Sequence, residues 1–213
     1  DSGTMGTKRF KIYEKHVALA VSLKLGKYIS DAFPEVEVIY TRDSDFFLEL
    51  NERTDIANKA NANLFISIHA DSHNSQAYGA GTFVLGLHRN ADNLRIAQKE
   101  NSVIFLEDNY LSNYEGFDPN NPESVISLVL MQEEYLDQSI IAANTIQESF
   151  TKNLKRRNRT VKQAGFIVLK YTYMPSVLVE TGFLTNKEEG KYLNSKKGQS
   201  EMALTIAKLG GLG

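Results

Sequence analysis

The chain has 213 residues, a net charge of −2 and no cysteine, and 42% of its residues are hydrophobic. This composition is ordinary for a globular protein, and an α/β domain of this length can bury a sizeable core. Without cysteine there can be no disulfide scaffold, thiolate catalysis or Cys-ligated metal, so His, Asp and Glu would have to hold any metal. A net charge of −2 does not favour binding to nucleic acid, which usually requires a strongly basic surface. No apolar stretch reaches the length of a transmembrane segment.

The first half of the chain alternates helical and strand-like patterns. Apolar residues at i, i+4 spacing predict a helix over Tyr13–Ala32, with Pro34 just beyond its end. The elements expected after it are a strand over Val36–Thr41, a helix over Leu48–Ala60, a strand ending at His69, a strand over Gly79–Leu85 and a helix over Ala91–Val103.

The second half begins with a break in periodicity from Phe105 to Pro122, where the chain is acidic, aromatic and rich in turn residues. The elements expected after it are a largely helical stretch over Ser124–Leu154, strands over Gly165–Lys170 and Ser176–Glu180, and helices over Lys187–Leu193 and Ser200–Leu209. This alternation predicts a three-layer α/β fold, in which a mostly parallel twisted sheet has helices on both faces. We expect residues 1–213 to form a single domain with one insertion, from about residue 107 to residue 136.

The chain opens on Asp1–Gly6, whose residues are typical of turns, and it shows neither an initiator methionine nor a signal peptide. We therefore expect a piece of a longer precursor from which a targeting segment has been removed. The absence of cysteine also suits an oxidising compartment outside the cytoplasm.

Two apolar runs end in side chains that can carry chemistry. The run from Leu64 to Ile68 reads as a buried strand that ends at His69, and Ser176–Val179 reads as a second strand that ends at Glu180. In open α/β sheets the carboxyl ends of the strands are where ligands bind. A histidine and a glutamate at one such edge suggest a metal-hydrolase site; the alternative is a structural histidine and a capping glutamate at loop starts.

A catalytic zinc site needs three protein ligands, an open position for water and a nearby base. Glu14, at the first turn of the first helix, is a further ligand candidate. Its alternative role is structural, because the helix dipole favours an acidic residue there.

Short motifs cover most of the chain outside Glu107–Leu136. They are Asp1–Gly3, Tyr13–Lys15, Thr41–Asp43, Leu50–Arg53, Ala57–Asn58, Ser67–Ala70, Val161–Ala164, Met174–Phe183 and Thr185–Asn186. Taken in this order, they resemble the zinc-dependent N-acetylmuramoyl-L-alanine amidases of bacterial cell walls, the group that includes the cell-separation amidases. Asp1–Gly3 resembles the residues just after that family's Gly-His-Gly-Gly motif, and Ser67–Ala70 its second histidine motif.

The resemblance implies that Glu14 and His69 are ligands of Zn²⁺ and that Glu180 is the catalytic carboxylate. The family's remaining ligand is the histidine of Gly-His-Gly-Gly, which would stand before Asp1, and we expect it on a first strand upstream. The implied reaction is hydrolysis of the amide bond between N-acetylmuramic acid and L-alanine in peptidoglycan, for cell-wall remodelling and daughter-cell separation, in the periplasm or cell wall.

Two other functions remain open at this stage. One is a catalytically incomplete peptidoglycan-binding or regulatory module of the same fold, since only two of the three ligands are in the sequence. The other is a zinc exopeptidase of similar architecture, although the sequence shows no second cluster of acidic ligands.

The acidic insertion from about residue 107 to residue 136 has a counterpart in the resemblance. In related cell-separation amidases, a helical insertion can cover the zinc and place a carboxylate on it until an activator protein binds. The resemblance thus implies a regulatory lid and autoinhibition. The alternative is a packed surface extension or a wall of the substrate groove.

Overall fold

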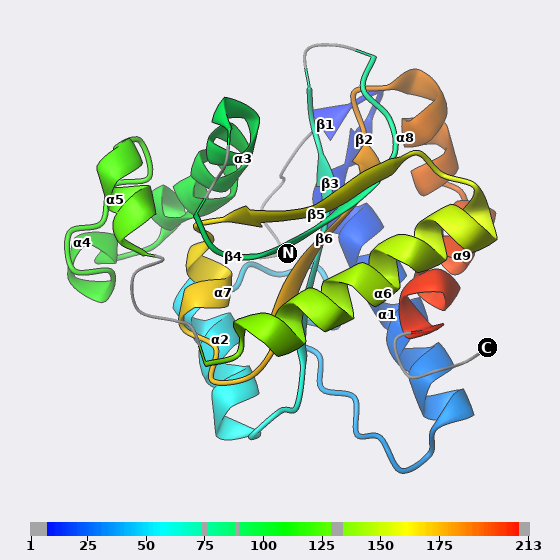
Figure 1. Ribbon diagram of the computed structural model, residues 1–213, viewed down its shortest axis with the longest axis horizontal. Coiled ribbons are helices and arrows are strands. Elements are labelled where there is room, and N and C mark those ends of the chain that lie inside the picture. Colours follow the sequence, from blue (N-terminus) through cyan, green and yellow to red (C-terminus); the bar gives the residue numbers. More distant parts are fainter. Residues whose placement is uncertain (1–7, 74–75, 88–89, 129–133, 209–213) are drawn as a thin grey trace.

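The computed structural model describes residues 8–73, 76–87, 90–128 and 134–208 (Figure 1). In chain order its elements are β1 (Lys8–Arg9), β2 (Ile12–Tyr13), α1 (Glu14–Ala32), α2 (Leu50–Lys59), β3 (Phe65–Asp71), β4 (Ala80–Leu85), α3 (Ala91–Asn101), the 3₁₀ helix η1 (Ser102–Leu106), α4 (Tyr110–Asn113), α5 (Pro122–Ser127), α6 (Leu136–Leu154), β5 (Asn158–Ala164), α7 (Ile167–Lys170), β6 (Ser176–Phe183), α8 (Lys187–Leu193) and α9 (Lys196–Ala207). The opening motif Asp1–Gly3 and residues 129–133 of the expected insertion lie outside the described residues.

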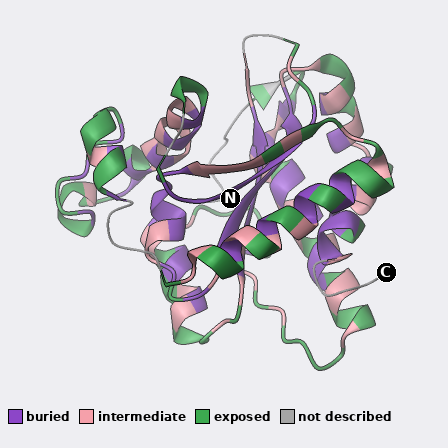
Figure 2. Ribbon diagram, viewed as in Figure 1, coloured by how far each residue is buried: buried purple, intermediate pink, exposed green. Residues whose placement is uncertain are grey.

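The centre of the molecule is a four-stranded sheet in the order β3-β6-β4-β5. The pairs β3/β6 and β4/β5 are parallel, whereas β4 runs antiparallel to β6. The strands β3, β6 and β4 are almost wholly buried, and β5 at the edge is half-exposed (Figure 2). The predicted open α/β sheet is confirmed, and it is a mixed sheet in which two of the three strand pairings are parallel.

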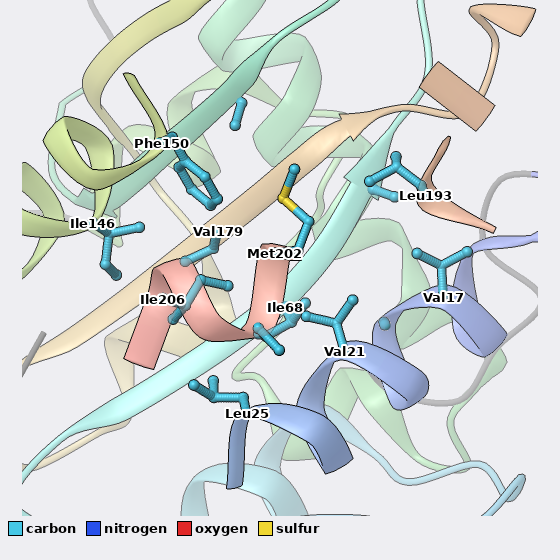
Figure 3. Close-up of a cluster of buried hydrophobic side chains, with 14 of the residues drawn as sticks. Val17, Val21, Leu25, Ile68, Ile146, Phe150, Val179, Leu193, Met202 and Ile206 are labelled. Carbon is cyan, nitrogen blue, oxygen red and sulfur yellow. The ribbon is translucent and has the colours of Figure 1, made fainter. Parts of the chain in front are cut away.

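Helices cover both faces of this sheet and make three layers. One face packs against α1, α6 and α9, and its core includes Val21 of α1, Ile68 of β3, Phe150 of α6, Val179 of β6 and Met202 of α9 (Figure 3). The other face packs against α2, α3 and α7 around a second apolar cluster. Among the described residues, none of the helices has the length and hydrophobicity that a membrane crossing needs.

The alternation of side chains along β3 and β6 decides what each face carries. Ile68 and Val179 point into the first core, so their neighbours in the chain, His69 and Glu180, point to the opposite face. On that face, residues of the second apolar cluster precede His69 and Glu180 along the two strands, and the polar side chains lie at the carboxyl ends of the strands. The fold thus presents His69 and Glu180 on one face.

Two predicted strands are wrong. Val36–Thr41 forms no strand among the described residues, because no other strand lies alongside it. A cavity of about 510 Å³ lies between this segment and β3. Gly165–Lys170 contains the short helix α7, and the strand is Asn158–Ala164 instead. The edge position of β5 lets it carry polar residues, whereas the apolar run after it is buried on all sides in the second cluster.

The helical stretch predicted over Ser124–Leu154 is divided into α5 and α6. Val125 of α5 packs in the second apolar cluster, while Phe150 of α6 packs in the first. Since the two clusters lie on opposite faces of the sheet, one continuous helix could not serve both.

Candidate metal centre

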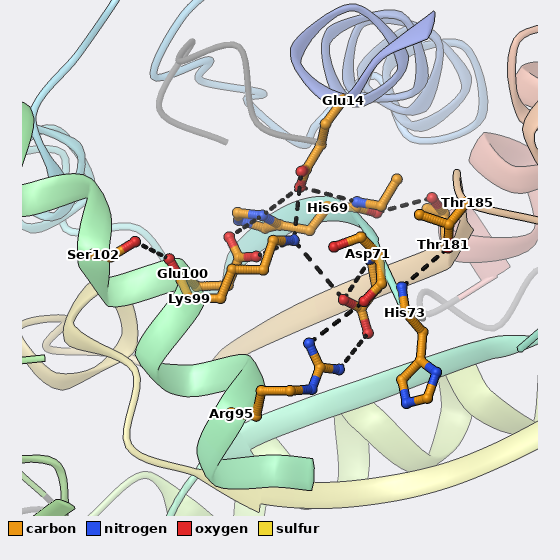
Figure 4. A network of polar contacts seen from close by, with 12 residues as sticks. Glu14, His69, Asp71, His73, Arg95, Lys99, Glu100, Ser102, Thr181 and Thr185 are labelled. Atoms are coloured by element: carbon orange, nitrogen blue, oxygen red, sulfur yellow. Dashed lines mark hydrogen bonds and ion pairs between the residues drawn. The ribbon is translucent and has the colours of Figure 1, made fainter. Parts of the chain in front are cut away.

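The three predicted site residues meet at the carboxyl ends of β3 and β6, and Figure 4 shows two of them, Glu14 and His69. His69 of β3 is the register partner of Glu180 of β6, so their side chains start side by side on one face. Glu14, the first residue of α1, reaches the same place: its Oε1 lies 3.1 Å from Nδ1 of His69 and accepts a hydrogen bond of 3.2 Å from the backbone N–H of Ala70. All three side chains are buried.

Glu100, near the end of α3, adds a further carboxylate. Its Oε2 lies 2.9 Å from Nδ1 of His69. One ligand atom each of Glu14, His69 and Glu100 lie within 4.8 Å of one another, so the same imidazole nitrogen faces two carboxylates. This group of side chains could hold a metal ion.

The ring of His69 is held in this orientation from its other side. Its Nε2 lies 3.0 Å from Oγ of Ser67, and that oxygen accepts a hydrogen bond of 2.9 Å from Nη2 of Arg53. Such a second contact at the far nitrogen orients a metal-ligating imidazole and leaves the other nitrogen for the metal. Burial lowers the pKa of Arg53 to about 10, so its guanidinium stays charged at neutral pH.

Lys99 lies among the acids. Its Nζ is 3.0 Å from Glu100 Oε1, 3.8 Å from Glu14 Oε2 and 3.8 Å from Asp71 Oδ1. Burial opposes the charge of Lys99, but the surrounding carboxylates outweigh it and raise its pKa well above the ordinary range. Burial likewise acts to raise the pKa of Glu14, and Lys99 with His69 brings that pKa below its ordinary value. Both groups are therefore ionised at neutral pH.

Glu180 has a different environment. Its carboxyl group is buried, and neither oxygen has a hydrogen-bond partner among the described residues. Burial raises the pKa of Glu180 well above its ordinary value, and the negative charges of Asp71 and Glu100 raise it further. The site thus combines a carboxylate whose pKa is lowered, that of Glu14, with one whose pKa is raised, that of Glu180, and a raised pKa suits a carboxylate to exchanging a proton near neutral pH.

The backbone at this edge is shaped by Gly182. Its φ of +155° is unusual for other residues, and a Cβ there would stand 2.7 Å from Nη2 of Arg156 and 2.8 Å from Oε2 of Glu189. Arg156 and Glu189 form an ion pair of 2.6 Å behind the strand end, and Arg156 also donates to the carbonyl of Thr181. This ion pair supports the end of β6. Any side chain at position 182 would displace it.

The donor set fits a zinc ion. Imidazole nitrogen and carboxylate oxygens are ordinary zinc ligands, and ligands at about 2.0–2.2 Å from a tetrahedral zinc stand about 3.3–3.6 Å from one another. The separations of 2.9 Å and 3.1 Å around Nδ1 of His69 are close to that spacing.

The comparison with known families decides which group of proteins this site belongs to. The family model described as N-acetylmuramoyl-L-alanine amidase matches residues 1–209. The chain belongs to the N-acetylmuramoyl-L-alanine amidase family. The resemblance found in the sequence is therefore confirmed, and with it the assignment of the chain to an enzyme family.

Relatives within the amidase family cover almost the whole chain. The amidase AmiA of Escherichia coli strain K12 is 31% identical over 98% of this chain and 70% of its own length. The probable amidase AmiB of Haemophilus influenzae is 33% identical over 94% of this chain and 46% of its own length. The solved catalytic domain of the amidase CwlV from Bacillus (Paenibacillus) polymyxa has a TM-score of 0.65 and 28% identity, and the match covers 98% of this chain and 88% of that domain.

The sequence predicts three of the residues that meet at this strand edge and does not predict three others. Glu14, His69 and Glu180 were singled out, whereas Asp71, Lys99 and Glu100 were not. Asp71 could have been found, because the period of two along a strand puts it on the same face as His69. Lys99 and Glu100 lie inside a correctly predicted helix, and nothing local in the sequence shows that this helix ends above the strand edge.

Proposed function

We propose that the protein is a zinc-dependent amidase that hydrolyses the bond between N-acetylmuramic acid and L-alanine in peptidoglycan, during cell-wall remodelling and daughter-cell separation. The observation that carries this proposal is the convergence of Glu14, His69 and Glu180 at one strand edge, in a chain of the amidase family. Because peptidoglycan lies outside the cytoplasmic membrane, we place the protein in the periplasm or cell wall.

Glu14 and His69 would hold the zinc ion. When bound there, zinc would polarise the scissile carbonyl and lower the pKa of a water molecule. The resemblance adds a histidine from a Gly-His-Gly-Gly motif, which this sequence does not contain. Glu100 supplies a third donor in the same cluster.

Glu180 would move the proton. Its oxygens have no hydrogen-bond partner among the described residues, so a water molecule between Glu180 and His69 can donate to them. The carboxylate would accept the proton from the attacking water and return it to the nitrogen of L-alanine as the amide bond breaks. The raised pKa of Glu180 favours the first half of this cycle, because a stronger base takes the proton from water more readily.

We further propose that Glu100 restrains the activity and that an activator releases it. The helix α3, which carries Glu100, continues directly into η1 and the following insertion, so a partner that moves the insertion would also move Glu100. A related fold, the CwlD amidase of Clostridioides difficile, has been solved in complex with the GerS lipoprotein; it has a TM-score of 0.69 and 24% identity to this chain.

The amidase proposal is tested by zinc content and by the release of stem peptides from purified peptidoglycan, with the full-length protein. We expect stoichiometric zinc in both wild type and Glu180→Gln, and a loss of cleavage in the variant of about 10²- to 10⁴-fold. Equal cleavage by both proteins would remove Glu180 from the mechanism. A wild type without zinc would refute the metal site.

The same assay tests the restraint with Glu100→Gln beside Glu115→Gln, an exposed glutamate of the insertion. We expect Glu100→Gln to keep its zinc and to cleave faster than the wild type, while Glu115→Gln behaves like the wild type. If Glu100→Gln loses zinc and activity together, Glu100 is a required ligand and the restraint is refuted.

A further inference from the structure

A small cavity of about 20 Å³ lies beside Glu180, and Asp71 of β3 also lines it. Its walls include Glu180 of β6, Gly81 of β4, and Arg159 and Lys162 of β5. The volume is enough for one water-sized group, such as a carboxylate oxygen. None of the β4 and β5 residues takes part in the metal centre described above.

The glycine in β4 creates this space. Gly81 of β4 is the register partner of Glu180, so β4 places no side chain next to that of Glu180. A Cβ built on Gly81 would stand 3.5 Å from Cβ of Arg159. A side chain at Gly81 would therefore fill the gap between the catalytic glutamate and the basic residues of β5.

Two positive charges face the gap. The guanidinium carbon of Arg159 lies 4.8 Å from the ring centre of Phe183, and Nζ of Lys162 lies 5.2 Å from the ring centre of Phe83. These aromatic faces hold the cations in place without neutralising them. In the part of the chain that the structure describes, Arg95 has Asp71 as an acidic partner at 3.8 Å, whereas Arg159 and Lys162 form no ion pair.

The two cations also act on each other. Burial lowers the pKa of Lys162, and the charge of Arg159 lowers it further; the carboxyl groups of Asp71, Glu180 and Asp92, which also face Lys162, act in the opposite direction. Like charges at a partly buried site are unfavourable, and a bound anion would relieve their repulsion.

The spacing matches an extended peptide. Neighbouring strands lie about 4.8 Å apart, so β5 is about 10 Å from β6 across the sheet. An extended chain advances about 3.3–3.6 Å per residue. If the nitrogen of L-alanine lies at Glu180, a carboxylate on the second residue of the stem peptide can reach Arg159 and Lys162.

We propose that Arg159 and Lys162 bind a carboxylate of the stem peptide, on the second residue after the scissile amide, and that this contact sets substrate specificity. The proposal rests on the amidase function proposed above. It assigns to the β5 edge the chemistry of anion recognition, by charge-assisted hydrogen bonds from two cations that have no acidic ion-pair partner among the described residues.

Peptide binding tests the proposal independently of cleavage. The probes are the peptide L-alanyl-γ-D-glutamyl-L-lysine and its counterpart with the second residue's α-carboxylate converted to the carboxamide, titrated into full-length protein by calorimetry. We expect at least tenfold tighter binding of the carboxylate form by the wild type. Lys162→Met and Arg159→Gln should each abolish most of that difference. Arg157→Gln, which removes an exposed cation from the same segment, should preserve it.

Gly81→Ala provides a second variant that leaves both cations in place. Its added methyl group would occupy the gap at an ordinary contact distance, so we expect it to weaken binding of the carboxylate peptide while circular dichroism stays unchanged. Equal affinity of the wild type for the two peptides, or a preference that survives in Lys162→Met, would refute the subsite.

Cleavage of the corresponding N-acetylmuramoyl tripeptides separates this proposal from the amidase proposal. We expect Lys162→Met to raise KM for the carboxylate substrate about tenfold or more and to leave kcat nearly unchanged. A wild type that prefers the carboxylate peptide but cleaves neither substrate would support the anion site and refute the amidase function. An equal fall of kcat on both substrates would refute the role in specificity.

Discussion

Glu180 carries its carboxyl group at 3% exposure, and its oxygens have no hydrogen-bond partner among the described residues. Burial, with the nearby charges of Asp71 and Glu100, raises its pKa well above the ordinary value of 4.5. Between that value and the folded-state pKa, the folded protein holds a proton that the unfolded chain has released. Stability must therefore fall as the pH rises through this window.

Removing the ionisable group should reverse this loss. In metal-free protein at pH 7, we expect Glu180→Gln to be more stable than the wild type by about 1–3 kcal/mol, with little gain at pH 4, because glutamine cannot ionise. Urea unfolding between pH 4 and pH 8 in the presence of a chelator measures the difference. The matched control is Glu148→Gln, on the exposed side of α6, which should show no such pH dependence. A gain that is equal at pH 4 and pH 8 would assign the effect to packing instead.

At the scale of elements, the start of the insertion is attached to α2. Glu107 accepts a hydrogen bond of 2.9 Å from the backbone N–H of Leu50 and one of 2.6 Å from the hydroxyl of Tyr114. That hydroxyl accepts a further bond of 3.1 Å from the N–H of Asn51. The insertion thus satisfies free N–H groups at the N-terminus of α2. The two carboxylates of the metal cluster belong to Glu14 and Glu100, and both residues lie before the predicted insertion.

Tyr114→Phe should loosen this attachment. The change leaves Oε2 of Glu107 and the N–H of Asn51 without the hydroxyl, so we expect a loss of about 1–3 kcal/mol in the free energy of unfolding. Urea unfolding measures that loss, and amide exchange over residues 107–117 should become faster. Tyr110→Phe, whose ring packs on Phe105 at 5.3 Å, is the control. Unchanged exchange in Tyr114→Phe would show that other contacts hold the insertion.

For the molecule as a whole, the sheet leaves room for another strand. Among the described residues, β3 pairs with β6 on one side only, and the cavity of about 510 Å³ on its other side is lined by α1, α2 and Val36–Tyr40. An extended apolar segment in this cavity would pair β3 with Val36–Tyr40, and we propose that a further strand occupies this place. An unpaired strand edge otherwise favours aggregation, because its free N–H and C=O groups can pair with a strand of another chain.

Hydrogen exchange tests whether Val36–Tyr40 is unpaired. In the chain described here, we expect the amides of Val38 and Ile39 to exchange within seconds to minutes and that of Leu178, at the centre of the sheet, to be protected far longer. Mass spectrometry after pulses of deuterium would measure both. Equal protection of the two segments would mean that Val36–Tyr40 is already paired.

The sequence by itself determined the parts of this protein that depend on local pattern. The i, i+4 spacing of α1 and the apolar runs of β3 and β6 were sufficient to predict these elements, and the ends of the two runs placed His69 and Glu180 at a strand edge. Glu14 and the amidase family followed from motifs in order along the chain. Each of these features rests on short segments or motifs whose own residues lie close together in the sequence.

Only the tertiary structure decided which distant groups meet. Glu100 and Lys99 join the centre because α3 packs so that its end lies above the edge of β3, and a helical pattern contains no information on where the helix will pack. The same reason explains the errors at Val36–Thr41 and at Gly165–Lys170. A strand exists only when a neighbour pairs with it, and an apolar run is a helix or a strand according to the space that the rest of the chain leaves.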